Sequence, residues 1–306
     1  MITQLKGILS ELLEYRSIRR HRSRIGWRDA PRYSRYLARC RREAPVTTKP
    51  EDEVAGSLDV FRHDGITSFH TATTGDVAAK MLSSLEAAER VGRQLWKPVD
   101  DYGSRVYAGD PWLDFPELER LFQASLGDFL TGYFGSPFKI FYGMMYRSEH
   151  MEGSRAGSQL WHSDSGPGIC VNVMFYLQDT TPAHSPLEAI PWAQSLSLYR
   201  QEKHLMRLQA LDKLGNNKRE RITRFYTDRI AADDSTLIHQ PHGPAGLVVP
   251  FLNNTLHRGG YPAKGHSRTA IVFHCYPSHR PVDLAIYRTQ GITKTAPYPN
   301  DPAEEF

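Results

Sequence analysis

The stretch GLVVPFLNNTLHRGGYPAKGHSRTAIVFHCY, residues 246–276, contains two apolar runs that are typical of buried β-strands. GLVVPF (246–251) and RTAIVFHCY (268–276) are rich in β-branched and aromatic residues, and a polar segment containing glycine and proline separates them. Similar runs occur earlier, as KIFYGMMYR from residue 139 and CVNVMFYL over residues 170–177. We therefore expect a β-rich body from residue 139 onwards.

Helical periodicity precedes these strands. We expect helices from about residue 74 to 93 and over residues 114–135, where apolar side chains share one helical face. PVTTKPEDE (45–53) is expected to be a linker, and FRHDGITSFH (61–70) a turn with a short strand. Helices followed by short β-runs predict a mainly β fold with supporting α-helices, namely an antiparallel barrel or jelly roll with a helical N-terminal region. Residues 1–49 are expected to form a basic helical extension, and residues 50–306 the main domain.

The composition is that of an ordinary soluble protein, with 40% hydrophobic and 24% charged residues. No apolar run approaches the roughly 18 residues that a membrane span requires, and no secretory signal is recognisable. The three cysteines, Cys40, Cys170 and Cys275, are odd in number and lack metal-site spacing, which favours a reducing compartment. We expect a cytoplasmic protein.

The basic character is concentrated at the N-terminus. Residues 1–49 hold 13 Lys and Arg against 4 Asp and Glu, a net charge of +9, and the remainder holds 25 against 30. An apolar helical pattern over residues 2–13 leads into arginines interleaved with aromatic residues. Residues 1–45 are thus predicted either to contact an anionic membrane surface or to form a helical extension with a solvated basic face. No nucleic-acid-binding motif accompanies them, so nucleic acid is not an expected partner.

A pair of potential metal ligands follows the run Gln159-Leu160-Trp161. In His162-Ser163-Asp164 the histidine and the aspartate are two residues apart, so on an extended backbone they point to the same side. His257 follows the apolar run GLVVPF. Two imidazoles and one carboxylate form the facial triad that suits iron(II) and leaves coordination positions open for other ligands.

A candidate carboxylate-binding residue lies eleven positions after His257. Arg268 opens the last apolar run, and a guanidinium group matches a carboxylate with two parallel hydrogen bonds. A 2-oxoglutarate molecule that chelates iron would extend its distal carboxylate toward such a residue. The ordered set of His162, Asp164, His257 and Arg268 therefore predicts an iron(II) site that uses 2-oxoglutarate as co-substrate.

The same residues carry a resemblance to a known family. QLWHSD (159–164), VNVMFYLQDTTPAHSPLEAIP (171–191), GLVVPFLNNTLHRGG (246–260) and Arg268 resemble the phytanoyl-CoA dioxygenase-like branch of the iron(II)/2-oxoglutarate oxygenases. The resemblance covers about residues 60–276. It implies a double-stranded β-helix, iron ligands at His162, Asp164 and His257, and 2-oxoglutarate at Arg268. Halogenases of the family lack the carboxylate ligand, so the presence of Asp164 favours hydroxylation.

This chain departs from the family pattern on the substrate side. Ser185 stands where the family has a turn glycine, Trp192-Ala193-Gln194 replaces a Gly-Ser-His stretch, and Gly259 replaces a hydroxyl residue. These differences leave the predicted metal site intact. Because of these differences, the resemblance does not indicate the substrate.

Further polar residues are candidates for contact with the co-substrate. Tyr146, Gln159 and Asn172 lie on or beside the predicted strands, and each is expected either to contact 2-oxoglutarate or to be a hydrogen-bonded interior residue. A charged insertion at about residues 195–229 is expected to be either a cationic lid over an anionic substrate or a solvated face.

The sequence thus predicts a dioxygenase that hydroxylates an unactivated C–H bond of a small or lipid-linked, anionic substrate and releases succinate and carbon dioxide. A soluble tailoring enzyme acting on a small natural product or amino acid is a second enzymatic reading. Two alternatives remain open, a non-catalytic β-helix binding module and a cupin-like metalloenzyme that uses no 2-oxoglutarate.

Overall fold

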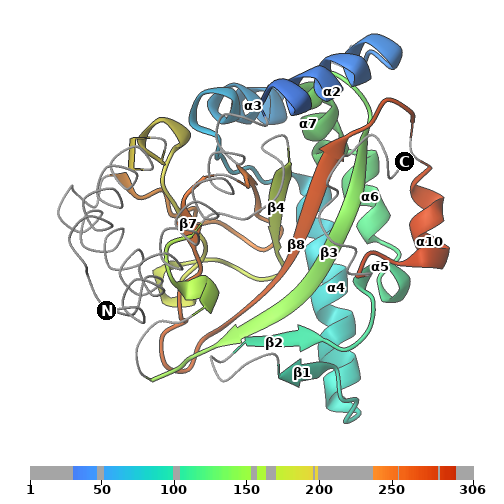
Figure 1. The fold of residues 1–306 in the computed structure, drawn as a ribbon. Coiled ribbons are helices and arrows are strands. Elements are labelled where there is room, and N and C mark those ends of the chain that lie inside the picture. The colour runs from blue at the N-terminus through green and yellow to red at the C-terminus, as the bar shows by residue number, and fades with distance from the viewer. Residues whose placement is uncertain are drawn as a thin grey trace, which may run out of the picture.

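Two β-sheets form the centre of the protein (Figure 1). The structure is a computed structural model, and it describes residues 30–46, 52–98, 104–152, 157–162, 170–195, 197–198, 237–253, 255–281 and 283–293. The larger sheet is antiparallel, with the strand order β1 (Trp96–Pro98), β2 (Ser104–Tyr107), β3 (Phe138–Glu149), β8 (Ser267–Pro277), β4 (Val171–Tyr176) and β6 (Val248–Leu252). The smaller sheet pairs β5 (Glu188–Ala189) with β7 (His257–Arg258).

Isolated bridges extend the smaller sheet on both sides. His162 pairs with His257 on β7, and His239 pairs with Ala189 on β5. The chain therefore alternates between the two sheets in the order larger (β3), smaller (162), larger (β4), smaller (β5, 239), larger (β6), smaller (β7) and larger (β8). This alternation is that of a double-stranded β-helix, and it confirms the predicted jelly-roll core with supporting helices.

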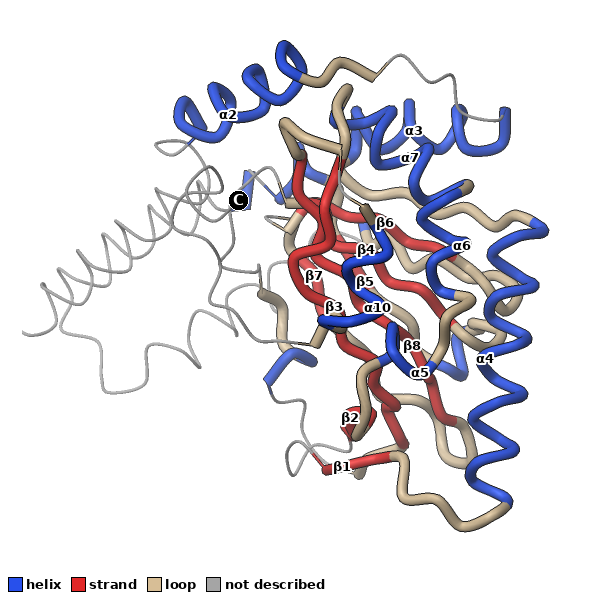
Figure 2. The backbone as a smooth tube through the Cα atoms, turned by 90° about the vertical axis from the view of Figure 1, so that its right-hand side faces the viewer, coloured by secondary structure: helices blue, strands red, loops and turns tan. Residues whose placement is uncertain are grey.

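Helices cover one face of the larger sheet (Figure 2). They are α3 (Asp52–Asp64), α4 (Ala72–Arg90), α5 (Pro111–Asp114), α6 (Leu118–Gln123) and α7 (Ser125–Phe134). Because strand side chains alternate between faces, Ile271 and Phe273 of β8 pack into the helix-facing core, whereas Ala270 and Val272 pack with the interior cluster between the sheets. The candidate site therefore lies on the interior face of β8, which is the face that carries Ala270.

Two helix predictions need correction. The expected linker over residues 45–53 is partly helical, because α3 begins at Asp52 and buries Val54, Leu58 and Phe61. The turn expected around Asp64-Gly65 is present, since α3 ends at Asp64 and Gly65 has a φ of 68°. The helix expected over residues 114–135 is interrupted at Ala124, between α6 and α7. A Cβ atom on Gly127 would lie 2.0 Å from the carbonyl oxygen of Phe122. Only glycine therefore permits the close approach of backbone at this break.

The described part of the N-terminal region is helix α2 (Ala30–Glu43), which lies against the main body. The hydroxyl of Tyr36 donates to the carbonyl oxygen of Pro277 over 3.1 Å, and Arg41 Nε donates to that of Phe134 over 2.6 Å. The predicted features of residues 1–29, and those of most of the charged insertion, lie outside the described residues. None of the helices that the structure describes has the length and apolar character needed to cross a bilayer.

Short elements complete the fold. They are the 3-10 helices η2 (Gly157–Gln159), η3 (Pro182–His184) and η5 (Leu284–Ile286) and the helix α10 (Tyr287–Gln290). Of these, η3 lies next to Arg268, whose Nη1 donates to the carbonyl oxygen of His184.

Candidate metal and carboxylate site

The structure brings His162 and His257 side by side on the smaller sheet. Each backbone N–H donates to the other residue's carbonyl oxygen, over 2.9 Å from His162 and 2.8 Å from His257. Side chains of directly opposed strand residues project from the same face. The two imidazole rings accordingly lie with centroids 4.4 Å apart and planes inclined by 54°. Residues separated by 95 positions in sequence thus present two imidazoles at one place.

A backbone carbonyl orients each ring. His162 Nδ1 donates to the carbonyl oxygen of Leu160 over 2.7 Å, and His257 Nδ1 donates to that of Thr255 over 2.8 Å. A carbonyl oxygen only accepts, so both hydrogen bonds require a proton on Nδ1 and place the lone pair of the neutral ring on Nε2. A hydrogen bond from one ring nitrogen to a backbone carbonyl is the usual support of a histidine that binds metal through the other nitrogen.

The predicted carboxylate ligand, Asp164, lies outside the described residues. Within the described ranges no three His, Cys, Asp or Glu side chains form a group able to hold a metal ion. The assignment of Asp164 as the third ligand therefore stays a prediction from the His-x-Asp spacing. Its neighbour two positions earlier, His162, is described and half-buried.

Arg268 is buried at the start of β8, with 2% of its surface exposed. Its Nη1 donates to the carbonyl oxygen of His184 and its Nη2 to the hydroxyl of Ser148, each over 3.3 Å. Nε is buried and finds no acceptor among the residues that the structure describes, and none of their carboxylates forms an ion pair with this guanidinium. Since a buried cation without a counter-ion is costly, the site is suited to bind an anion.

Two tyrosines lie close enough to Arg268 to interact with its charge. In the sheet, Tyr146 of β3 and Tyr176 of β4 both oppose Ala270, so they share the interior face with Arg268. Burial raises the pKa of Tyr146, and the Arg268 guanidinium offsets this only in part. Burial likewise raises the pKa of Tyr176. Both hydroxyls are therefore neutral near pH 7 and can act as hydrogen-bond donors.

A single chain segment connects the guanidinium with the histidine pair. At one end the carbonyl of His184 accepts from Arg268, and at the other end Ala189 pairs with His257. Five peptide units span at most about 17 Å, so this length limits the separation of the two contacts. Between them, the backbone N–H of Leu187 donates to the Tyr176 hydroxyl over 3.0 Å. The anion-binding and imidazole groups thus belong to one barrel interior.

The two remaining predicted residues are both buried near the histidines. Asn172 on β4 opposes Phe251 on β6, whose ring centroid lies 4.8 Å from that of His257. The Cys170 thiol donates to Asn172 Oδ1 over 3.3 Å. Gln159 lies against Gly259, where a Cβ atom would be 3.0 Å from its Oε1. Nothing in the described chain places either side chain in contact with Arg268.

Sequence reasoning did not identify the groups that hold these residues. Ser148 could have been predicted from the sequence, because it stands two residues after Tyr146 on the same strand and therefore shares its face. No local sequence motif indicates the contacts that Arg258 makes. Its guanidinium lies 4.5 Å from the Trp161 ring centroid and forms an ion pair with Glu188 of β5. These contacts hold β7, which carries His257, in place.

Comparison with solved structures supports this fold. EctD from S. alaskensis with bound Fe matches 84% of this chain and 86% of that chain, with 16% identity and a TM-score of 0.51. The non-heme alpha ketoglutarate dependent epimerase SnoN from nogalamycin biosynthesis matches 81% of this chain and 93% of that chain, with 14% identity and a TM-score of 0.49. EvdMO1 matches 73% of this chain but 50% of that chain, with 17% identity and a TM-score of 0.47. The likeness to EctD shows a shared fold, and the two weaker matches add nothing to that conclusion. No protein-family model and no curated protein matches this chain.

Proposed function

We propose that this protein is an iron(II)- and 2-oxoglutarate-dependent oxygenase. The observation that carries the proposal is the pair formed by His162 and His257, whose Nδ1 atoms are both engaged by backbone carbonyls. With the proton held on Nδ1, each imidazole can offer the Nε2 lone pair to a divalent metal, and the two rings lie with centroids 4.4 Å apart. The EctD structure, which has this fold, contains bound Fe, and this is compatible with iron in the same kind of barrel.

In the proposed site, His162, Asp164 and His257 hold the iron. Arg268 binds the distal carboxylate of 2-oxoglutarate. The edge of its guanidinium that carries Nε is where a carboxylate would form two parallel hydrogen bonds, with Nε and Nη2 as donors. The hydroxyl of Tyr146 donates to Met174 Sδ over 3.4 Å, which is a weak acceptor, and rotation of this hydroxyl would let it donate to the carboxylate instead. When bound, iron with 2-oxoglutarate supplies the oxidation, in which dioxygen is consumed and succinate and carbon dioxide are released.

The protein's own residues contribute position and shielding. Arg268 has 2% of its surface exposed and His257 has 5%. Charge–charge and hydrogen-bond interactions are stronger at such buried positions than in water. Phe251, packed against the His257 ring, adds an apolar wall beside the metal ligands.

Hydroxylation of an unactivated C–H bond is the outcome that we propose, because Asp164 leaves no ligand position for a halide. From the sequence, we propose that the substrate is a small or lipid-linked anionic molecule. Its support is the row of cations at Arg200, Lys203 and Arg207, which lies outside the described residues.

The proposal is tested by measuring succinate formed from 2-oxoglutarate with iron(II) and ascorbate in the presence of substrate pools. Turnover is expected for the wild-type protein and is expected to be lost in His162→Ala and Asp164→Ala. Full activity in either variant would show that the ligand assignment is wrong. Metal-dependent activity without 2-oxoglutarate would instead favour the cupin-like alternative.

A further inference from the structure

The carboxamide of Gln178 continues the larger sheet beyond the end of β4. The last residue pair between β4 and β8 is Tyr176 with Ala270, and the following backbone N–H, that of Leu177, donates to the carbonyl oxygen of Thr269 over 3.1 Å. Gln178 Oε1 then accepts from the backbone N–H of Thr269 over 3.2 Å, and its Nε2 donates to the carbonyl oxygen of Ser267 over 2.5 Å. One side chain thus replaces the peptide group that a longer strand would supply.

These two hydrogen bonds lie on either side of Arg268. Ser267 and Thr269 are its immediate neighbours in sequence, and on the opposite side of β8 the residue paired with Arg268 is Ser148 of β3. The backbone at Arg268 is therefore held by β3 on one side, and on the other by Gln178 together with the Leu177 N–H. A strand end without such partners frays readily.

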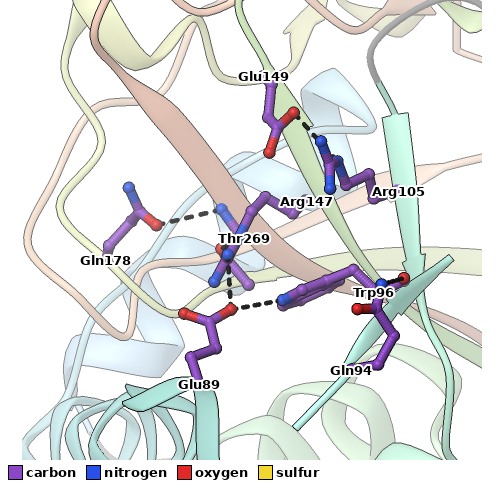
Figure 3. A network of polar contacts seen from close by, with 8 residues as sticks. All are labelled: Glu89, Gln94, Trp96, Arg105, Arg147, Glu149, Gln178 and Thr269. Carbon is purple, nitrogen blue, oxygen red and sulfur yellow. Dashed lines mark hydrogen bonds and ion pairs between the residues drawn. The ribbon is translucent and has the colours of Figure 1, made fainter. Parts of the chain in front are cut away.

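A second set of contacts holds β8 next to Arg268 from the helix-facing side of the sheet (Figure 3). Arg147 Nε donates to the Thr269 hydroxyl over 3.3 Å, and its Nη1 forms an ion pair with Glu89 of α4 over 2.7 Å. The guanidinium lies 4.3 Å from the centroid of the Trp96 ring, whose Nε1 donates to the same Glu89 oxygen over 2.6 Å. Helix α4 is thereby connected through Arg147 to the strand that carries Arg268.

From this geometry we infer that Gln178 is a positioning residue, which sets the selectivity of the site for a 2-oxo acid with a distal carboxylate. The inference rests on the proposed function. Among the residues that the structure describes, Gln178 hydrogen-bonds only to the backbone on both sides of Arg268, so it acts through the placement of the guanidinium. A displacement of about 1 Å in such a group is enough to weaken a bidentate interaction strongly. The 2-oxo acid end, bound at the metal, is not affected by this placement.

The test compares two ligands that share the metal-chelating end. 2-Oxoglutarate has a distal carboxylate and 2-oxobutanoate lacks one. Each is titrated anaerobically into the iron(II)-loaded full-length protein, and the visible charge-transfer absorption gives its dissociation constant. In Gln178→Met, which is similar in size but makes neither hydrogen bond, we expect 2-oxoglutarate to bind roughly tenfold more weakly, as the loss of one to two hydrogen bonds implies. We expect 2-oxobutanoate binding to stay within about twofold of wild type.

Gln94→Met is the matched control. Gln94 belongs to the same network, but its hydrogen bond is to the Trp96 carbonyl oxygen on β1 and not to β8. Both ligands are expected to bind this variant as they bind wild type. If Gln178→Met does not fold, Gln178→Asn keeps a carboxamide that is one methylene too short to reach both backbone groups, and it is expected to produce a smaller loss that is again restricted to 2-oxoglutarate.

The outcomes separate this inference from the proposed function. Equal losses for both ligands, or no loss for either, in Gln178→Met, or in Gln178→Asn if Gln178→Met does not fold, would overturn the positioning role. Failure of the wild-type protein to bind 2-oxoglutarate would overturn the proposed function itself, before any variant is compared.

Discussion

Ser185 and Gly260 are packed so closely that a β-carbon on the glycine would lie 1.6 Å from the Ser185 hydroxyl oxygen and 2.8 Å from its Cβ. Ser185 is also the one non-glycine residue of the described chain with positive φ, at 47°, a conformation that costs an L-residue roughly 1–2 kcal/mol. The turn that carries His184 toward Arg268 is thus held in a strained conformation against the loop segment that follows β7.

This contact predicts that Gly260→Ala is destabilising and that Ser185→Gly rescues it. Rotation of the serine hydroxyl relieves the shorter clash but not the one with Cβ, so the single variant is expected to lose about 1–3 kcal/mol of unfolding free energy. Ser185→Gly removes both atoms. Denaturant unfolding of the two single variants and the double variant measures the coupling. Additive effects would show that the two residues do not share this space.

Arg268→Met tests whether the guanidinium is present for a ligand rather than for stability. The wild-type cation is buried without a carboxylate partner in the described chain. Replacing it with an apolar side chain is therefore expected to leave the ligand-free protein equally stable or up to about 1 kcal/mol more stable. The rise in Tm that 2-oxoglutarate causes with metal present is expected to disappear. A large loss of stability in the ligand-free variant would argue for a structural role.

The Glu89–Arg147 ion pair predicts a pH-dependent contribution to stability. Burial raises the pKa of Glu89, but the hydrogen bonds from Trp96 and Arg147 outweigh it, so the pKa lies below its ordinary value of 4.5. A lowered pKa stabilises the fold at pH values above the ordinary one, and the stabilisation is lost as the pH falls through the pKa of the folded protein. Glu89→Gln is thus expected to destabilise the protein at about pH 7 and to destabilise it less at about pH 3.

Unfolding of Glu89→Gln and wild type at the two pH values measures this effect. Glu149→Gln is the matched control, since it removes an exposed ion pair with Arg105, and exposed pairs contribute little. A Glu89→Gln deficit of equal size at both pH values would contradict the expected linkage.

The strands were predictable because their signal is local. β4 and β8 coincide within a residue or two with the apolar runs at 170–177 and 268–276. The break at Ala124 was not visible, since Leu121, Phe122 and Leu126 continue one helical pattern through it and all are buried. The start of α3 was missed because the polar stretch PEDE precedes its first buried residue, Val54, although Leu58 and Phe61 follow at helical spacing.

The site was predictable only where ligand chemistry leaves a motif. His162 and His257 follow from metal-ligand spacing, and the structure shows them paired. Gln178, His184 and Ser148 act through backbone carbonyls, hydroxyls or amides at particular registers. Such contacts depend on which strands are neighbours, and no residue pattern in a single sequence records that.

Contact of the basic N-terminal segment with an anionic membrane surface stays a prediction from sequence. The arginines at positions 16, 19, 20, 22 and 24 are expected to contribute about 1 kcal/mol each to binding of anionic vesicles. Co-sedimentation with phosphatidylserine-containing liposomes is expected to fall sharply when all five are changed to glutamine. Equal pelleting of the two proteins would instead support the alternative that this segment has a solvated basic face and does not contact the membrane.

The central claim is that His162 and His257 hold one metal ion beside an anion-binding Arg268. Anaerobic titration of iron(II) followed by 2-oxoglutarate tests it most directly. We expect one iron per chain and a visible absorption band that forms with 2-oxoglutarate in the wild-type protein but not in His257→Ala. A band of unchanged intensity in His257→Ala, or no iron binding by the wild-type protein, would contradict the account.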